Sequence, residues 1–365
     1  PKTGIPEYWD GTQKWITPAE LNEDTYIITD SIRKLTELGV EKAGLSSFPE
    51  GTVILSSRAP IGKVAIAGCE MYCNQGFKNL ICSEKINNHY LYWFLKGRTE
   101  YLNSLGRGAT FKEISKQIVS NIEIDVPPIE QQKRAVNQLE KANAIIQLRK
   151  QQLQKLDELV KARFIELFGD PMTDISKWST STIGEQFNVT SGGTPATGEK
   201  AYWENGTIPW IGSNMCQDTI LSGNDGKFIT EEGYTHSSAK WFHKGTVLVA
   251  LVGATIGKTA LLRFDTTTNQ NIAAIDVNNN VAFSSEFVFY HMQMLYAKFM
   301  EIGNGKFKMA NQGFIRQLPL VCPPLALQQR FAAFVEQADK SKVTIQKALD
   351  EAQLLFDSLM QKYFG

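Results

Sequence analysis

The chain has 365 residues, which allows two or three domains that each bury a core, and no apolar run approaches the ~20 residues needed to span a bilayer. Its composition, 42% hydrophobic and 21% charged, excludes long disorder, while five scattered cysteines without a CxxC pair argue against disulfides or zinc and indicate a cytoplasmic protein. Basic and acidic residues balance at 38 each, so the chain lacks the positive field of a protein that grips nucleic acid alone.

Residues 1–128 are expected to form a first domain that is mixed and rich in β-structure. Runs of Val, Ile and Thr predict strands at residues 52–56 and 62–67, and an aromatic patch predicts helix at residues 88–104. The domain ends in the apolar strand IEIDVPP, whose second proline suits the first turn of a helix, because the missing N–H costs nothing there.

Residues 129–172 are predicted to be mainly one long helix, because residues 129–168 contain neither Gly nor Pro. Apolar side chains recur there at the alternating spacing of three and four that is typical of a coiled-coil seam. A helix of that length measures ~60 Å. The side chains expected to pair with another helix are Leu139, Ile146, Leu153, Leu156 and Val160.

Residues 173–324 are predicted to be a second domain that repeats the first. The segment GTVLVALVGATIGKTA restates GTVILSSRAPIGKVA, and strands are expected at residues 246–252 and 259–263, with helix at residues 285–302. A tandem duplication predicts approximate internal two-fold symmetry. Further matches are Asn74-Gln75 with Asn269-Gln270, Pro127-Pro128 with Pro323-Pro324, Gln131-Gln132 with Gln328-Gln329, and Phe168-Gly169 with Phe364-Gly365.

The first copy lacks one part of the second. Pro1 aligns with Pro195, so nothing in the first copy matches residues 177–194, which include the strand-like IGEQFNVTSGG. Two explanations are open: the natural start of the chain is missing, or another element takes that place.

Residues 325–365 are predicted to be a second long helix, with Val335, Ile345, Leu349, Phe356 and Leu359 in its seam. A long helix with an apolar stripe cannot stand alone, so the two helices are expected to pack together. Two-fold symmetry predicts that they run antiparallel, whereas a parallel pair would set the two domains side by side. The expected fold is therefore α+β, with two β-rich mixed domains separated by two long helices packed as an antiparallel coiled coil.

Two loops carry glycines, amides and cations in a pattern that suits contact with nucleic acid. Residues 303–316 include three cations and no acid, and their counterpart is residues 106–116. Glycine lets a backbone approach a phosphate closely, and Lys, Arg, Asn and Gln are the side chains that bind base edges. An ordinary solvated loop is the alternative interpretation.

No catalytic constellation is evident. The stretch from Gly253 to Thr259 has three residues between its glycines where a phosphate-binding loop needs four, and a strand is expected after it. The sequences DVPPI and VCPPL lack the Asn or Asp directly before Pro-Pro that a DNA methyltransferase needs, and no Gly-rich cofactor loop precedes them. The four histidines have no counterparts in the other copy, and no metal site is expected.

This ordered set of features, repeated twice, resembles the specificity (S) subunit of type I restriction–modification systems over essentially the whole chain. The residues that carry the resemblance are the Gly-Lys turns at Lys63 and Lys258, the Asn-Gln pairs, the Pro-Pro turns leading into Gln-Gln, and the Phe-Gly ends of the helices. The incomplete start of the first copy departs from the family pattern and puts a complete first DNA-reading surface in doubt.

The resemblance implies a non-catalytic subunit in which each β-rich region is a target-recognition domain for one half of a bipartite double-stranded DNA target. The helices would set the gap and dock two methyltransferase (M) subunits, and restriction (R) subunits could join. S-adenosylmethionine and ATP are expected on those partners, with no cofactor on this chain. The side chains assigned to DNA contact, with the two turn lysines at turn tips, are Lys63, Arg107, Thr110, Lys112, Lys258, Lys306, Lys308 and Asn311.

Two other classes of protein are open. One is a structural adaptor whose coiled coil joins proteins without DNA, and failure to bind any duplex in the presence of methyltransferase would favour it. The other is a nucleotide-using enzyme that relies on the Gly-Lys-Thr turn, and ATP binding by the isolated chain would favour that.

Overall fold

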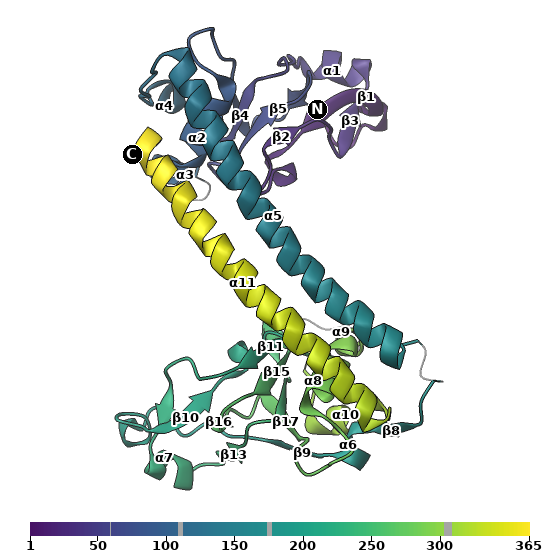
Figure 1. Cartoon of the computed structure of the whole chain (residues 1–365). Helices are drawn as coiled ribbons and strands as arrows, with labels where there is room; N and C mark the ends of the chain where they lie inside the picture. The colour runs from purple at the N-terminus through teal and green to yellow at the C-terminus, as the bar shows by residue number, and fades with distance from the viewer. Residues whose placement is uncertain (59, 109–111, 174–176, 303–308) are drawn as a thin grey trace. The chain divides into compact units, whose positions relative to one another are not determined.

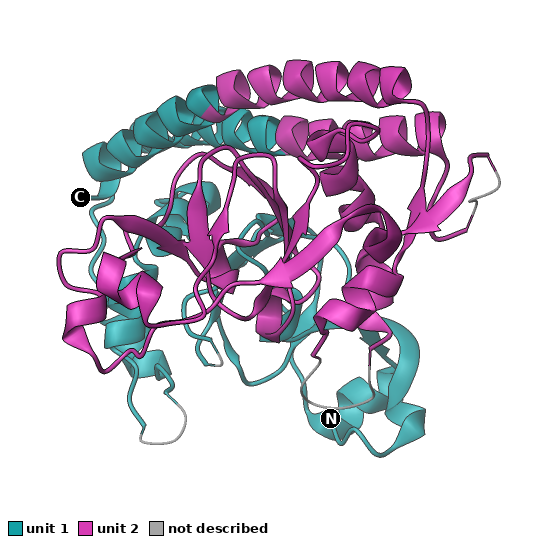
Figure 2. Cartoon of the chain, turned by 90° about the horizontal axis from the view of Figure 1, so that it is seen from below, with its two compact units in different colours: residues 1–150, 347–365 teal, residues 151–346 magenta. Residues whose placement is uncertain are grey.

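The computed structural model describes residues 1–58, 60–108, 112–173, 177–302 and 309–365. The chain divides into two compact units (Figure 2): unit 1 comprises Pro1–Lys150 and Lys347–Gly365, and unit 2 comprises Gln151–Gln346. Each unit therefore joins one β-rich region to parts of both long helices, a grouping that differs from a division into four separate segments. No helix among the described residues is long and apolar enough to cross a membrane.

Among its described residues, unit 1 contains two small sheets and four short α-helices. The main sheet has the strand order β2 (Ile27–Ile28), β5 (Val64–Ala67), β4 (Val53–Ser56) and β7 (Phe77–Leu80). The second sheet has the order β3 (Arg33–Leu35), β1 (Trp9–Ile16) and β6 (Tyr72–Cys73). The helices are α1 (Glu37–Ala43), α2 (Asn88–Lys96), α3 (Thr99–Ser104) and α4 (Lys116–Ser120).

Unit 2 contains three sheets among its described residues. The main sheet has the order β11 (Thr219–Leu221), β15 (Thr259–Leu262), β14 (Val247–Ala250), β17 (Ile272–Asp276) and β9 (Asn188–Ser191). The second has the order β12 (Phe228–Ile229), β10 (Ile208–Ile211), β16 (Thr266–Thr268) and β13 (Trp241–Phe242), and the third pairs β18 (Pro319–Val321) with β8 (Thr180–Thr182). The helices are α6 (Ile183–Gln186), α7 (Glu231–Thr235), α8 (Ser285–Met294), α9 (Tyr296–Met300) and α10 (Gln312–Gln317).

The strand and helix predictions inside the repeat are confirmed, except that residues 122–128, which were expected to form an apolar strand, form no strand. The hairpins β4–β5 and β14–β15 are both antiparallel and fully buried, as expected for runs of β-branched residues between two layers. The patch predicted as helix is a pair of helices in each copy, α2 with α3 and α8 with α9. Their aromatic side chains complete the core against the sheets, with Phe287 and Phe289 among the largest fully buried residues.

The two long helices, α5 (Ile129–Phe168) and α11 (Leu325–Phe364), each have 40 residues and run antiparallel, as predicted (Figure 1). In unit 1 the Tyr363 hydroxyl near the end of α11 donates to Gln138 near the start of α5, at 2.7 Å. In unit 2 the order is reversed, with Lys342 of α11 2.7 Å from Asp157 in the second half of α5. The structure therefore confirms the antiparallel coiled coil.

The side chains assigned to the helix seam are all buried or half-buried. Leu139, Val160 and Val335 are buried because they also belong to the hydrophobic core of their unit, and Ile146 is buried as well. The remaining seam positions are half-buried: Leu153, Leu156, Ile345, Leu349, Phe356 and Leu359. Three aromatic residues that the heptad does not include, Phe164, Phe168 and Phe331, are fully buried in unit 2 and contact one another.

A buried glutamine fixes the start of each long helix. The Gln132 side chain accepts from the Asn87 N–H at 2.8 Å and donates to the carbonyls of Lys85 and Pro127 at 2.9 and 2.7 Å. Gln328 makes the same three bonds, from the Ser284 N–H and to the carbonyls of Ala282 and Pro323, at 2.9, 3.0 and 2.8 Å. Each glutamine thus ties a long helix to the chain just before α2 or α8.

Candidate nucleic-acid interface

Several loops lie at one end of the main sheet of unit 2, because the neighbouring strands that they connect are antiparallel. Ser191 at the end of β9 lies opposite Ala273 at the start of β17, and Ala250 at the end of β14 lies opposite Ile272. Val249 in turn pairs with Thr259 at the start of β15. The connections 192–194, 251–258 and 269–271 therefore meet, and we call this surface the loop end of unit 2.

Unit 1 has the equivalent loop end. Ser56 at the end of β4 pairs with Phe77 at the start of β7, and Leu55 pairs with Val64 at the start of β5. The described residues of the connection 57–63 therefore meet the connection 74–76 in the same way.

The loops predicted to contact nucleic acid reach these ends through main-chain bonds. In unit 1, isolated bridges join Glu113 to both Arg58 and Arg107. In unit 2, a bridge joins Val252 to Met309, and the Ala310 N–H donates to the Leu251 carbonyl at 2.8 Å. The structure thus brings the described parts of both predicted loops next to the Gly-Lys turns, a proximity that sequence spacing did not reveal.

The Ile-Gly-Lys part of each turn is required by the fold. Ile61 and Ile256 are each 4% exposed, in the cores of their units. Gly257 has φ +76°, which favours glycine, and a Cβ there would lie 2.7 Å from the Phe299 ring. The segment that follows is strand β15, so the turn lacks the helix that a phosphate-binding loop requires.

The prediction that Lys63 and Lys258 lie at turn tips is wrong. Lys63 directly precedes β5, and its ammonium donates to the carbonyls of Pro18 at 3.1 Å and Leu21. Lys258 directly precedes β15, and its ammonium lies 2.5 Å from the Asp218 carboxylate. Both half-buried lysines satisfy protein oxygens, so any DNA contact they make competes with these bonds.

The Asn-Gln pair of each copy builds a turn that presents a glutamine. The Asn74 side-chain oxygen accepts from the Gly76 N–H at 2.9 Å, and that of Asn269 accepts from the Asn271 N–H at 3.1 Å. Gln75 and Gln270 are consequently exposed at the turn between them. A glutamine side chain can form the paired hydrogen bonds by which proteins recognise adenine.

From the sequence alone, Gln75 and Gln270 were interpreted only as matching positions of the repeat. Their role as candidate base contacts was missed. An asparagine favours a turn in which its side chain accepts from the backbone N–H two residues later. Asn74 and Asn269 were therefore recognisable in the sequence as turn residues. Gln270 is held further, because its side-chain oxygen accepts from the Thr194 hydroxyl at 2.5 Å.

Two predicted cations of unit 1 are available at its loop end. Arg107 and Lys112 are both exposed. The main chains of Arg107 and Glu113, which directly follows Lys112, exchange two hydrogen bonds of 3.1 and 3.0 Å. The nearby Glu113 carboxylate lies 3.3 Å from Lys78, which reduces its repulsion of a phosphate. Lys78 is a further candidate that the sequence reasoning missed.

Of the other four residues assigned to DNA contact, only Asn311 lies among the described residues. Asn311 is exposed, but its side-chain oxygen caps α10 by accepting from the Phe314 N–H at 2.9 Å. Only its side-chain N–H₂ group is left for a base or a phosphate. Thr110, Lys306 and Lys308 lie outside the described residues.

A cluster of Tyr26, His89 and Glu140 in unit 1 resembles a catalytic site but is explained by packing. The Tyr26 hydroxyl is 2.5 Å from both the His89 ring and the Glu140 carboxylate, and burial, together with Glu140, raises the pKa of Tyr26. The three residues tie the start of β2 to α2 and α5. Among the described residues, no group of His, Cys, Asp and Glu could hold a metal ion.

Comparison with known proteins agrees with this architecture. A family model described as the type I restriction modification DNA specificity domain matches residues 1–158 and 175–353, so the chain belongs to that family. One relative is the type I restriction enzyme MjaIX specificity subunit of Methanocaldococcus jannaschii. It is 28% identical over 99% of this chain and 88% of its own length.

Solved structures share the fold across nearly the whole chain. One, from work on complex assembly and conformational transition of the type I R-M system, has a TM-score of 0.60 at 18% identity and covers 97% of this chain and 92% of its own. The S subunit of a type I restriction–modification system from M. genitalium has a TM-score of 0.56 at 16% identity, with 98% and 94% covered. At these identities the likeness concerns the fold alone.

Proposed function

We infer that this chain is the DNA sequence-specificity subunit of a type I restriction–modification complex and has no catalytic activity of its own. The observation that carries the proposal is the repeated loop end. Both units place an exposed glutamine, Gln75 or Gln270, beside the Gly-Lys turn at the same end of the same kind of sheet. Two such surfaces on one chain suit a DNA target that has two separate parts.

At each loop end we expect some side chains to position the DNA and others to recognise its bases. Cations such as Arg107 and Lys112 would contact phosphates, which fixes the register but carries no sequence information. Gln75 and Gln270 would contact base edges in the major groove. Because acidic and basic residues balance over the whole chain, partner subunits would supply much of the remaining positive surface around the duplex.

The long helices suit the role of a spacer and a docking surface. Each belongs in part to unit 1 and in part to unit 2, so a continuous helix joins one loop-bearing region to the other. Large apolar side chains outside the seam are exposed along both helices and suit two methyltransferase subunits: Ile145, Leu148, Leu159, Ile165, Val343, Leu354 and Leu355. Those cytoplasmic partners would carry S-adenosylmethionine, and restriction subunits that join them would carry ATP.

The proposal is tested by DNA binding of the chain purified together with a methyltransferase subunit from the same organism. Fluorescence anisotropy with a mixed pool of duplexes should show binding that weakens steeply as salt rises, because phosphate contacts release counterions. Absence of binding to any duplex would favour a structural adaptor. Binding of ATP by the isolated chain would instead favour a nucleotide-using enzyme.

A further inference from the structure

The two loop ends differ at one pair of bridged residues. In unit 2, Val252 follows the end of β14 by two residues and is bridged to Met309, two residues before the cap of α10. In unit 1, Arg58 follows the end of β4 by two residues and is bridged to Glu113, two residues before the cap of α4. Val252 and Met309 therefore correspond to Arg58 and Glu113.

The bridged pair is charged in unit 1 and apolar in unit 2. The Glu113 carboxylate lies 3.3 Å from Lys78, whose ammonium also donates to the Ser57 hydroxyl at 3.0 Å. In unit 2, Met309 is 67% exposed and Val252 is half-buried. Residues directly opposite each other point to the same face, so these two side chains form one apolar surface, which we call the loop-end patch. Single exposed apolar side chains are common, so the groups around the patch decide its meaning.

The side-chain amide of Gln270 lies on one side of the loop-end patch. Strands β14 and β17 pair with Ala250 opposite Ile272, and a main-chain bond between the next two residues continues this register past the strands. Gln270 consequently lies opposite Val252. The Gln270 side-chain oxygen accepts from the Thr194 hydroxyl at 2.5 Å, which leaves the N–H₂ group to donate to a ligand.

A second amide lies on the other side of the loop-end patch. Asn311 follows Met309 by two residues and is exposed. Its side-chain oxygen caps α10 by accepting from the Phe314 N–H at 2.9 Å, so its N–H₂ group is likewise the part left for a ligand. The apolar patch therefore has a hydrogen-bond donor on each side, and the oxygen of each donor group is already engaged.

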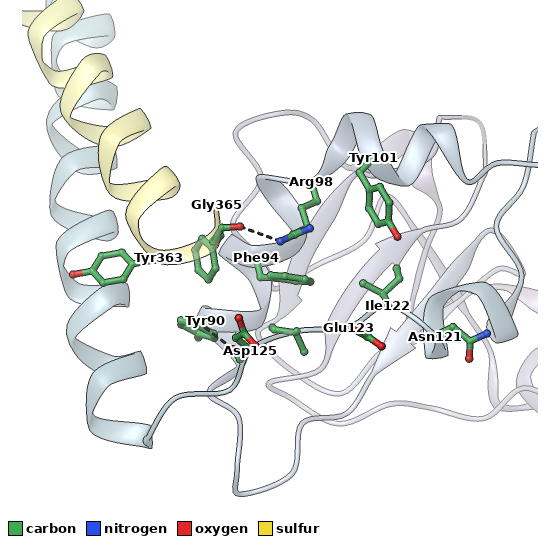
Figure 3. A pocket seen from close by; sticks show the side chains of 12 residues that line it. Tyr90, Phe94, Arg98, Tyr101, Asn121, Ile122, Glu123, Asp125, Tyr363 and Gly365 are labelled. Carbon is green, nitrogen blue, oxygen red and sulfur yellow. Dashed lines mark hydrogen bonds between the residues drawn. The ribbon is translucent and has the colours of Figure 1, made fainter.

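The cavity of unit 1 shown in Figure 3, with a volume of about 760 Å³, contains a cation but is not part of a loop end. It is lined by α2, residues 121–125 and the end of α11. The Arg98 guanidinium there donates to the Phe364 carbonyl at 3.0 Å and lies 4.5 Å from the centre of the Phe94 ring. This cation therefore holds α11 against α2, and base recognition is assigned to the loop ends instead.

An apolar patch between two donors matches the major-groove edge of thymine. Thymine presents the O4 acceptor next to a C5-methyl group. Adenine and cytosine present an N–H₂ donor, which would meet amides whose oxygens already accept a bond. Guanine presents two acceptors and no methyl group, and covering an acceptor with apolar surface costs free energy. Thymine is therefore the base that suits both the patch and the donors.

We propose that the loop-end patch of unit 2 recognises a thymine in the half-target of that unit. Val252 and Met309 contact the C5-methyl group, and the N–H₂ group of Gln270 or Asn311 donates to O4. The inference rests on the proposed function and assigns a base to unit 2 alone. In unit 1 the corresponding pair is charged, so its half-target is recognised by different chemistry.

The test replaces single thymines by uracil, which removes only the C5-methyl group, in the duplex target identified by mapping methylated bases. Competition binding to the chain in complex with its methyltransferase partner gives the relative affinity of each duplex. At a thymine that the patch contacts, uracil should weaken binding about fourfold, the factor that corresponds to burying one CH₂ group. Met309→Gln should lose most of this difference, because a polar side chain of similar size gains little from a methyl group.

Two variants serve as controls. Met309→Leu keeps an apolar side chain and should keep the fourfold difference. Val281→Ala removes another exposed apolar side chain, 89% exposed beyond the other end of β17, and should also leave the difference unchanged.

Two results would overturn the inference while DNA binding itself persists. One is equal affinity for thymine and uracil at every position of both half-targets. The other is a difference between thymine and uracil that Met309→Gln leaves unchanged at every position. Failure to bind any duplex would instead overturn the proposed function, and this inference with it.

Discussion

Residues at matching positions of the two units can have different physical roles, and His291 is a clear example. It lies seven residues after the cap of α8, where α2 has Phe94. Its Nε2 is 2.8 Å from the Pro319 carbonyl, which can only accept, so Nε2 carries the hydrogen. Nδ1 is buried without a partner, and burial lowers the pKa of His291 from 6.5 to about 4.

This buried histidine should make unit 2 sensitive to acid. Below pH 6.5 the unfolded chain takes up a proton on His291 that the folded chain does not take up until about pH 4, so stability falls as the pH falls through this window. At pH 5 the loss relative to pH 7.5 should be roughly 2 kcal/mol. Urea unfolding at the two pH values measures it.

His291→Phe copies the residue of the first unit and serves as the comparison. It should be less stable at pH 7.5, because the Pro319 carbonyl loses its donor, at a cost of about 1–2 kcal/mol. It should also lose most of the difference between pH 7.5 and pH 5. A variant that keeps the full difference would show that other groups cause the acid sensitivity.

The exposed glutamines should affect DNA recognition one half-target at a time. Gln75→Ala should relax discrimination at one part of the target only, and Gln270→Ala at the other, because each side chain lies on a different unit. Loss of a paired contact to a base is worth about 1–3 kcal/mol, roughly a 5- to 150-fold change in relative affinity. Competition binding with duplexes altered at single positions measures this.

Gln131→Ala is the control, since Gln131 is exposed at the start of α5 and belongs to none of the connections that form the two loop ends. It should leave the ranking of duplexes unchanged. If Gln75→Ala and Gln270→Ala also leave it unchanged, these side chains do not contact bases.

At the scale of elements, the repeated Gln-Gln pair divides into one buried and one exposed residue. Gln132→Ala should destabilise the protein by roughly 1–3 kcal/mol, because the part-buried Asn87 N–H and the Lys85 and Pro127 carbonyls lose their side-chain partner. Gln131→Ala should change stability by less than about 0.5 kcal/mol. Urea unfolding followed by circular dichroism compares them, and equal effects of the two substitutions would contradict the anchoring role.

The elements were largely predictable because their signals are local. Buried strands such as β14 are short runs of β-branched residues, and the helix seams repeat every seven residues over 40-residue segments. The outcome for Lys63 shows where local signals fail. Its partners Pro18 and Leu21 lie 45 and 42 residues earlier in the chain, and no spacing rule connects them. The fully buried Phe164 was missed because it contacts Phe287 outside the coiled coil.

At the scale of the whole molecule, the duplication explains why the chain has two loop ends and two helices. Each helix depends on the other for burial, and each unit needs part of both. The spacing between two bound half-targets should therefore follow the length of the paired helices. Residues 138 and 157 of α5 contact residues 363 and 342 of α11, so residues 148–154 lie across from residues 346–352.

The most direct measurement is a map of methylated bases in cells that carry this chain with its methyltransferase, compared with a variant lacking residues 148–154 and 346–352. Removing one heptad from each helix preserves the seam and shortens the pair by about 10 Å, or about three base pairs. We predict a two-part motif with a fixed gap for the natural chain and a gap about three base pairs shorter for the variant. A continuous motif, or the same gap in both, would contradict the account.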